Sequence, residues 1–232
     1  MTRVAVFGAA GRMGRLIAAE AAAGTVDMIQ AFDAGDELTL DPSVEVVLDF
    51  SLPSAWNDLD GLLKGTGVAL VSGTTGLGEK EIALLHQWKA SHPVFYSSNM
   101  SVGIHVLGRL MELASGMLGE NFDRELIEFH HRNKKDSPSG TALSLLKNWD
   151  GERVFGRRGN TGERKTGSVG VHAVRGGDVT GEHHLYFMGD GERLTLSHMA
   201  TDRRVFALGA IRAAVFVAGK PPGMYSMEDM LG

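Results

Sequence analysis

The sequence predicts an α/β fold in which a doubly wound parallel sheet is joined to a second, smaller α+β domain built on a mostly antiparallel sheet. Three observations lead to this prediction. Residues 1–102 alternate short unbroken apolar runs with helical segments, whereas residues 103–203 carry three strand-like segments in succession. Gly accounts for 31 of the 232 residues, nearly twice its usual share of roughly 7%. So many glycines indicate tight turns or close approaches of the backbone to a ligand.

The first domain is predicted from strands and helices in strict alternation. Short apolar runs, which suit strands buried on both faces, occupy residues 4–7, 26–32, 44–50, 68–71 and 94–96. Segments of helical character lie between most of them, at residues 16–21, 53–63 and 79–88. Repeated strand, helix and strand predict parallel strands joined by right-handed crossovers.

The pattern changes near residue 101. An amphipathic helix is expected over 102–118, a strand over 125–129 and a helix over 139–147. Strands at 168–174, 183–187 and 193–198 follow with no helix between them, which favours antiparallel pairing. An apolar helix at 205–218 can pack back on the first domain. We therefore predict a dinucleotide-binding domain of residues 1–102, completed by 204–232, and a substrate-binding and oligomerisation domain of residues 103–203.

Charge and composition exclude several classes of protein. The net charge is −5, from 23 basic and 28 acidic residues, which argues against a nucleic-acid partner. The absence of cysteine excludes disulfides, thiol nucleophiles and Cys-ligated metals. No apolar stretch reaches the roughly 18 residues of a membrane span, and the N-terminus lacks a signal-peptide pattern. We expect a cytoplasmic protein with no membrane partner.

A glycine-rich turn, Gly8-Ala9-Ala10-Gly11-Arg12-Met13-Gly14, follows the first strand and opens the first helix. Its G-x-x-G-x-x-G spacing is a variant of the dinucleotide fingerprint, which makes the predicted sheet Rossmann-like. Bare backbone N–H groups at a helix N-terminus attract a pyrophosphate. Asp33, at the end of the second strand, stands where an acid accepts hydrogen bonds from the adenosine ribose. The alternative is a glycine-rich turn without a ligand.

Two further turns belong to the same sheet edge. Residues 72–76 follow the fourth strand and residues 97–99 follow the fifth. The carboxyl edge of an open α/β sheet is where ligands bind. These turns are therefore candidates for the nicotinamide half of the site, although Gly, Ser, Thr and Asn are also ordinary turn residues.

A second motif fills residues 125–142, where a strand delivers His130 and His131, then Lys134, then the turn Pro138-Ser139-Gly140-Thr141. N–H and hydroxyl donors at a helix N-terminus suit a carboxylate. With a lysine and a histidine beside them, they predict a pocket for a small dianion with a proton donor next to it. A solvated loop with an N-cap serine is the alternative. The spacing fits no metal site, so no metal is predicted.

The stretch 125–142 resembles the signature of the dihydrodipicolinate reductase family, nicotinamide-dependent enzymes of lysine and diaminopimelate synthesis. The likeness extends over nearly the whole chain. It includes residues 6–14, 48–51, 73–76, 99–103, 175–178, 181–183, 219–220 and 223–227. The resemblance implies reduction of 4-hydroxy-tetrahydrodipicolinate by hydride transfer from a nicotinamide, and a homotetramer formed through the sheet of the second domain.

The resemblance also implies roles for individual residues. His130 corresponds to the acid/base and Lys134 to the cationic proton donor. His131, Gly140 and Thr141 correspond to contacts with the substrate carboxylate, next to Ser139. The expected cofactor contacts are Gly8, Ala9, Ala10, Gly11, Arg12, Met13, Asp33, Gly73, Thr74, Thr75, Ser97, Ser98, Asn99 and Met100.

The cofactor is expected to be NADH or NADPH, with NADH modestly preferred. Asp33 faces the 2′-phosphate of NADPH with like charge, and Ala34 replaces an arginine that some family members carry. Arg12 can supply a compensating cation. Met100 stands where an aromatic residue often lies beside the nicotinamide.

Two other functions remain open from the residues alone. One is a different two-domain dehydrogenase acting on a small dicarboxylate. The other is a dinucleotide-sensing protein without turnover, since a fold alone does not define a function. A sensor predicts a degraded catalytic motif, whereas His130, Lys134 and the Pro-Ser-Gly-Thr turn are all present.

Overall fold

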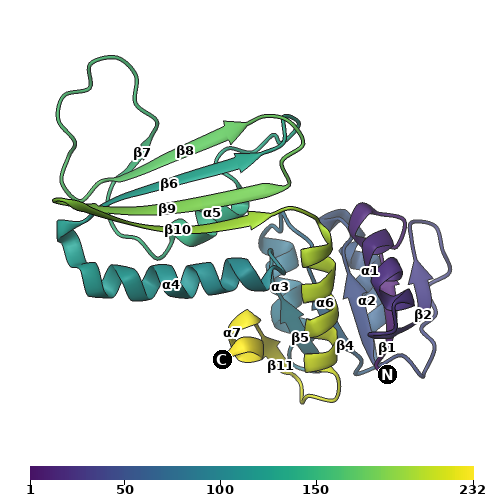
Figure 1. Ribbon diagram of the computed structural model, residues 1–232. Helices are drawn as coiled ribbons and strands as arrows, with labels where there is room; N and C mark the ends of the chain where they lie inside the picture. The colour runs from purple at the N-terminus through teal and green to yellow at the C-terminus, as the bar shows by residue number, and fades with distance from the viewer. The chain divides into compact units, whose positions relative to one another are not determined.

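Two compact units make up the chain, which the computed structural model describes over all 232 residues (Figure 1). The first unit contains Met1–Val102 and Arg203–Gly232, and the second contains Gly103–Asp202. The chain leaves the first unit once and returns to it. Its C-terminal segment therefore completes a core that the N-terminal strands begin.

The first unit is built on a six-stranded sheet in which every pairing is parallel. Its strands are β1 (Arg3–Phe7), β2 (Asp27–Phe32), β3 (Val46–Asp49), β4 (Ala69–Ser72), β5 (Pro93–Tyr96) and β11 (Gly223–Tyr225), in the spatial order β11-β5-β4-β3-β1-β2. The first five follow the predicted apolar runs. The sequence did not predict β11, because three residues carry no readable period and only pairing with β5 makes them a strand.

Helices cover both faces of this sheet (Figure 1). Alternate strand residues enter two cores, with Val4 and Val6 on one face and Ala5 and Phe7 on the other. The first core is closed by α1 (Arg12–Ala22), α6 (Arg204–Val217) and α7 (Met227–Leu231). The second is closed by α2 (Trp56–Leu63), after the short η1 (Pro53–Ala55), and by α3 (Glu79–Trp88). The predicted doubly wound sheet is confirmed.

The second unit is built on a five-stranded sheet of order β10-β9-β6-β8-β7. Its strands are β6 (Asp123–His130), β7 (Arg153–Phe155), β8 (Val169–Arg175), β9 (Gly181–Gly189) and β10 (Glu192–Ala200). The pairings of β6 with β9 and of β9 with β10 are antiparallel, whereas β8 pairs in parallel with both β6 and β7.

This sheet is thus mixed, where the sequence indicated a mostly antiparallel one. Strands β8, β9 and β10 are consecutive in the chain, but β6 lies between β8 and β9 in the sheet. The helix α5 (Gly140–Leu146) lies between β6 and β8 in the sequence, and such a crossover returns the chain in the parallel direction. The pairing partner of the strand at 123–130 decides the character of the sheet.

Helices cover one face of the mixed sheet. Leu107 and Met111 of α4 (Val102–Leu118) and Leu145 and Leu146 of α5 pack against the strands, with the short η2 (Gly119–Asn121) between α4 and β6. This is the inner face, and because side chains alternate along a strand, Glu128 and His130 lie on it as well. Ile127, Phe129 and Tyr186 have the opposite parity and are only half-buried. None of the helices combines the length and the apolar character that a membrane span requires.

The basic stretch between α5 and β8 is tied to the outer face of this sheet. Arg157 donates two hydrogen bonds to the carboxylate of Glu125, at 2.8 and 3.2 Å, and Arg164 lies 3.1 Å from the same carboxylate. His172 on β8 approaches it at 2.8 Å. Arg157 and Arg164 therefore hold the long loop against β6.

The glycine loop of the first unit allows α1 to begin directly against β1. A Cβ built on Gly14 would lie 2.5 Å from Cα of Ala9, which no real side chain tolerates. We expect Gly14→Ala to push the helix away from the loop and to cost about 1–3 kcal/mol of unfolding free energy. Urea denaturation measures this change.

Gly61→Ala is the matched control, because Gly61 lies inside α2 and a Cβ added there would meet nothing within 4 Å. It should stabilise the protein by about 0.5–1 kcal/mol through helix propensity. A Gly14→Ala variant as stable as the wild type would contradict the close approach.

Candidate active site

A pocket of about 780 Å³ lies along the carboxyl edge of the parallel sheet, within the first unit. It opens beside the ends of β1 and β3, where the strand order reverses direction, the usual binding position in such sheets. Ten of the predicted cofactor residues line it: Gly8, Gly11, Arg12, Met13, Asp33, Gly73, Thr74, Thr75, Ser98 and Met100.

The glycine loop uses its own N–H groups to shape this pocket. The amides of Gly8 and Ala9 donate to the carbonyl of Phe32, at 2.8 and 3.2 Å, and the amide of Gly11 donates to the carbonyl of Gly8. Gly11 is the N-cap of α1 and has no side chain to cap the helix. The first amides of α1, those of Arg12 and Met13, thus remain for an anion in the pocket.

Asp33 serves the loop as well as the pocket. Its Oδ2 accepts a hydrogen bond of 2.8 Å from the amide of Ala10. This contact holds the carboxylate at the wall of the pocket and leaves Oδ1 available to a ligand. Ala10 and Ala9 themselves are not part of the wall, so among the predicted cofactor residues they act through the loop geometry.

Ser97 and Asn99 also lie behind the wall. The hydroxyl of Ser97 donates to the carbonyl of Asn99 at 2.7 Å, and the Asn99 side chain accepts from the amide of Ser101 at 2.8 Å. Both residues form the turn after β5. They hold Ser98 and Met100 in the positions that line the pocket.

Asp49 joins the loops after β3 and β4 at this edge, and no role was predicted for it. It ends β3 and is fully buried. Its carboxylate accepts hydrogen bonds from Ser51 at 2.5 Å, from Ser72 at 2.7 Å, from Thr74 at 2.8 Å and from the indole of Trp56 at 3.2 Å. Donors from four residues satisfy a buried carboxylate that has no cation, and they hold the loops after β3 and β4 together.

Arg203 is a second residue that the sequence did not single out. It lines the pocket together with Arg12, from the start of α6. Burial and then the nearby charge of Arg12 lower the pKa of Arg203 from its ordinary value. Its sequence position, 170 residues after Asp33, offers no signal that it joins the glycine loop.

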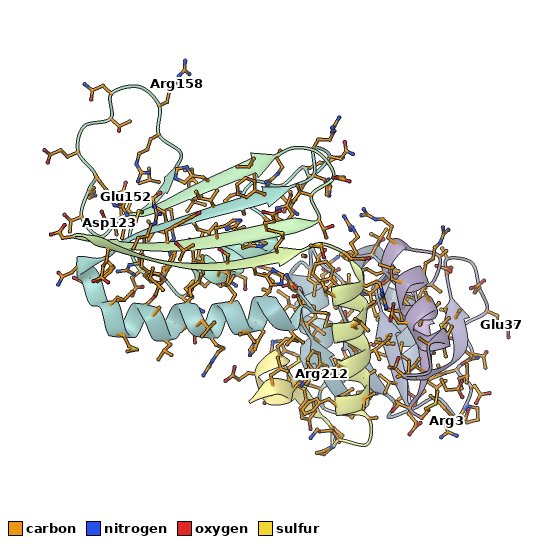
Figure 2. All side chains as sticks on the ribbon, in the orientation of Figure 1. Arg3, Glu37, Asp123, Glu152, Arg158 and Arg212 are labelled. Carbon is orange, nitrogen blue, oxygen red and sulfur yellow. The ribbon has the colours of Figure 1, made fainter.

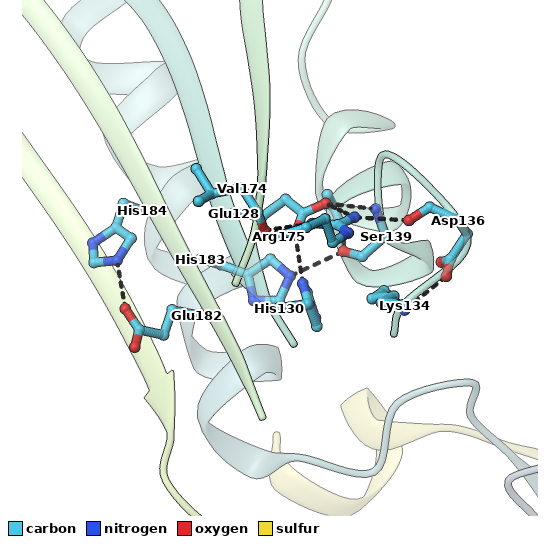
Figure 3. A network of polar contacts seen from close by, with 11 residues as sticks. Glu128, His130, Lys134, Asp136, Ser139, Val174, Arg175, Glu182, His183 and His184 are labelled. Atoms are coloured by element: carbon cyan, nitrogen blue, oxygen red, sulfur yellow. Dashed lines mark hydrogen bonds and ion pairs between the residues drawn. The ribbon is translucent and has the colours of Figure 1, made fainter. Parts of the chain in front are cut away.

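The second unit brings His130, Lys134 and Ser139 together around the end of β6 (Figure 3). Nδ1 of His130 lies 2.5 Å from Oε2 of Glu128, two residues earlier on the same face. Glu128 is fully buried and forms a bidentate ion pair with Arg175 of β8, at 2.7 and 2.8 Å. Its Oε1 also accepts from the amide of Ser139 at 3.0 Å.

Glu128 remains ionised under all ordinary conditions. Burial by itself would raise its pKa, but the hydrogen bonds from His130, Arg175 and the Ser139 amide lower the pKa to about 2. Sequence reasoning assigned no role to Glu128 or Arg175. The spacing Glu-x-His on a strand was the available signal for Glu128, because it places both side chains on one face.

Lys134 lies in the turn after β6. The amide of Lys134 donates to the carbonyl of His131 at 3.1 Å, and its Nζ pairs with Asp136 at 3.0 Å. In Figure 3, His130 and Lys134 both lie on the lower side of the network. Burial would raise the pKa of Asp136, but its hydrogen bond with Lys134 and the lysine charge lower it. A substrate carboxylate that binds Lys134 therefore competes with Asp136.

The turn that opens α5 is partly used by the protein itself. The hydroxyl of Ser139 accepts from the amide of Ala142 at 3.1 Å and lies 3.2 Å from Nε2 of His183. With its amide bound to Glu128, Ser139 is fully engaged, and its predicted contact with substrate stays a prediction. Gly140 is exposed, and Thr141 and His131 are half-buried, next to this turn.

His183 closes the network from β9. Its ring lies edge-to-face against that of His130, with centroids 5.4 Å apart. Burial, followed by the charge of His130, lowers the pKa of His183 to about 3, so its ring is neutral at pH 7. Its side chain is buried on the inner face of the sheet, opposite Glu128. The structure contains no group of three or more His, Cys, Asp or Glu side chains placed to hold a metal ion.

Figure 2 shows all side chains on the two units. The class of protein is that of dinucleotide-dependent oxidoreductases, which combine a glycine loop at the edge of a parallel sheet with a buried acid and histidine in a second unit. Comparison with known proteins identifies the family. Residues 2–100 match the family model of the dihydrodipicolinate reductase N-terminus, and residues 103–231 match that of its C-terminus. The chain belongs to the dihydrodipicolinate reductase family.

Curated relatives support this assignment over the full length of the chain. The 4-hydroxy-tetrahydrodipicolinate reductase of Alkalilimnicola ehrlichii is 40% identical, with 100% of this chain and 99% of the relative covered. That of Sulfurimonas denitrificans is also 40% identical, with the same coverage. Among solved structures, dipicolinate-bound dihydrodipicolinate reductase from Paenisporosarcina sp. TG-14 has the same fold, with a TM-score of 0.75, 20% identity and full coverage of both chains.

The buried His183 makes stability depend on pH in a defined direction. Because the folded ring has a pKa of about 3 and the unfolded ring one near 6.5, the unfolded chain binds an extra proton between these values. His183 therefore contributes a loss of stability as pH falls below 6.5, of at most about 1.4 kcal/mol per pH unit. We expect His183→Gln to flatten the curve of unfolding free energy between pH 6.5 and pH 4.

Urea unfolding at a series of pH values measures this effect. His86→Gln, at an exposed position of α3, controls for the loss of an imidazole. Parallel curves for the wild type and His183→Gln would show that His183 is not held neutral by the fold.

Proposed function

We propose that this protein reduces 4-hydroxy-tetrahydrodipicolinate to tetrahydrodipicolinate in diaminopimelate and lysine synthesis, with NADH or NADPH as the reductant and with the 4-hydroxyl group leaving as water. Membership of the dihydrodipicolinate reductase family makes it an NAD(P)H-dependent oxidoreductase. The observation that carries the proposal is the intact polar network at the end of β6, where His130 bonds to an ionised, buried Glu128. A protein that only senses dinucleotides has no need of a buried acid and histidine in its second unit.

The first unit fits a nicotinamide dinucleotide. A helix N-terminus without a side-chain cap and a loop that has no room for a Cβ at Gly14 provide the cradle for a pyrophosphate. Asp33 can accept from the adenosine ribose, and Thr74 and Thr75 can contact the nicotinamide half. When bound, the reduced nicotinamide supplies a hydride to the substrate ring.

His130 supplies the proton in our proposal. Once the 4-hydroxyl has left as water, hydride can add to a ring carbon–carbon double bond conjugated with the imine. Negative charge then accumulates on the imine nitrogen, so a positioned acid lowers the barrier. His130 can donate from Nε2, because Nδ1 is engaged by Glu128. Lys134 then provides a cation close to the developing charge, after exchanging Asp136 for the substrate.

The substrate carboxylates need further donors. His131, Gly140 and Thr141 are the candidates, because Ser139 is already bonded within the protein. The bound dipicolinate in the structure of the Paenisporosarcina relative supports a small cyclic dicarboxylate as the class of ligand. A diacid of this kind also fits the cation of Lys134 and the N–H donor of His130 that our proposal places at the site.

Assembly and location remain part of the proposal. The outer face of the mixed sheet has no helix on it, and there Met199 is 58% and Val174 is 40% exposed. Exposed apolar side chains on a sheet face without helices support a homotetramer formed through the second unit. A role in amino-acid biosynthesis is consistent with the cytoplasm.

Substitution of the two catalytic candidates tests the proposed reaction. We expect His130→Gln and Lys134→Ala to lower turnover by roughly 10²- to 10⁴-fold, the usual worth of a positioned acid. The affinity for NADH should barely change, because the cofactor pocket is lined by residues of the first unit. The measurement is oxidation of NADH with freshly generated cyclic substrate.

Lys135→Ala is the control, since Lys135 is the exposed neighbour of Lys134. It should leave turnover unchanged. If either His130→Gln or Lys134→Ala keeps more than about half of wild-type turnover, that residue has no part in the transition state.

Cofactor preference tests the wall of the first pocket. Asp33 repels a 2′-phosphate, while Arg12 and Arg203 in the same wall attract it, with a bidentate contact worth about 1.5–3 kcal/mol. We expect both cofactors to be used, with NADH better by less than about a hundredfold in kcat/KM. Ala34→Arg should shift the ratio toward NADPH, and Arg12→Ala should shift it toward NADH.

Steady-state kinetics with each cofactor measure the ratio. Arg15→Ala is the control, because Arg15 is exposed on the same helix and does not line the pocket. A wild-type enzyme that strongly prefers NADPH would contradict the placement of Asp33 at the ribose.

A further inference from the structure

The ion pair of Glu128 with Arg175 joins three parts of the active site. We propose that it is the positioning unit of the site, which fixes the proton on Nδ1 of His130 and holds the Lys134 turn in register with that histidine. The inference rests on the proposed function for the role of His130. It extends that function to two residues that themselves need not touch the substrate.

Glu128 fixes the tautomer of His130. An ionised carboxylate only accepts hydrogen bonds, and Glu128 stays ionised because its pKa is about 2. The 2.5 Å contact with Nδ1 therefore requires a proton on Nδ1. Nε2 is left as the nitrogen that gains and loses a proton, and it is the atom from which an imidazolium donates.

Arg175 connects Glu128 to the Lys134 turn. A fully buried carboxylate is costly unless it is paired and hydrogen-bonded. Arg175 donates two bonds to Glu128 and a third, of 2.7 Å, to the carbonyl of Asp136. The side chain of Asp136 in turn holds Lys134 at 3.0 Å. A continuous set of polar contacts thus leads from His130 through Glu128 and Arg175 to Lys134 (Figure 3).

The space around the His130 ring is narrow. A Cβ built on Gly181, at the start of β9, would lie 2.9 Å from Nε2 of His130. The imidazole thus fits closely against bare backbone on that side. His183 lies edge-to-face against it on another, with centroids 5.4 Å apart. With these neighbours and the bond at Nδ1, the ring has one defined orientation.

A test that needs no substrate measures the tautomer directly. In the wild-type protein labelled with ¹⁵N-histidine, the His130 signals, assigned with His130→Gln, should show a proton on Nδ1. The proton in the short bond to Glu128 should resonate far downfield. A neutral ring with its proton on Nε2 would overturn the proposal, whatever the activity of the enzyme.

Kinetics then test the positioning role. Glu128→Gln keeps the shape of the side chain, but an amide can either accept from or donate to Nδ1, so the tautomer is no longer fixed. We expect kcat to fall by roughly 10- to 100-fold, part of the usual worth of a positioned acid, with a smaller change in KM and loss of the downfield proton. Arg175→Lys keeps a cation but loses the bidentate geometry, and its kcat should lie between those of Glu128→Gln and the wild type.

The same strand offers a matched control. Glu125 is also a buried carboxylate of β6 with two arginines and a histidine around it, but it lies on the opposite face of the sheet. Glu125→Gln should lower stability without changing kcat or the His130 signals. If Glu128→Gln does no more than Glu125→Gln, the ion pair is merely structural and the proposal fails. A wild-type protein inactive on the cyclic substrate would instead overturn the proposed function, while the tautomer measurement keeps its meaning.

Discussion

The structure of the second unit depends on one constraint, the burial of the Glu128 carboxylate beneath the inner face of the mixed sheet. A buried charge is tolerated only when it is paired and its lone pairs are satisfied. Arg175, His130 and the Ser139 amide meet this requirement from β8, β6 and the turn before α5. The pairing of β8 with β6 meets this requirement, because it places Arg175 opposite His130 across the two strands.

The first unit solves a similar problem without a cation. Asp49 ends a central strand, as buried as Glu128, and hydroxyl and indole donors from three neighbouring segments satisfy it. In both units a carboxylate near the carboxyl end of a strand therefore holds the turns that carry the functional groups. The difference suits the chemistry, because Glu128 must keep its charge to orient a histidine, whereas Asp49 only has to join two loops.

Much of the site was predictable, because its residues are close together in the sequence. The glycine loop sits between a strand and a helix, and the motif of residues 125–142 contains His130, Lys134 and the turn before α5 within a few residues. Glu128 could also have been predicted, because it lies two residues before His130 on the same strand. The roles of three other residues could not have been predicted from spacing, because each comes to its site from a strand or helix distant in the chain. These residues are Arg175, His183 and Arg203.

The sequence by itself determined the two-domain class, the parallel sheet and the position of the glycine loop between β1 and α1. Period and glycine spacing are local properties, and they survive without knowledge of what packs against them. Only the tertiary structure decided that the second sheet is mixed, that β11 extends the first, and that Ser139 is bonded to Glu128. These outcomes depend on which distant strand lies alongside and which buried charge must be satisfied, and a single stretch of sequence contains neither.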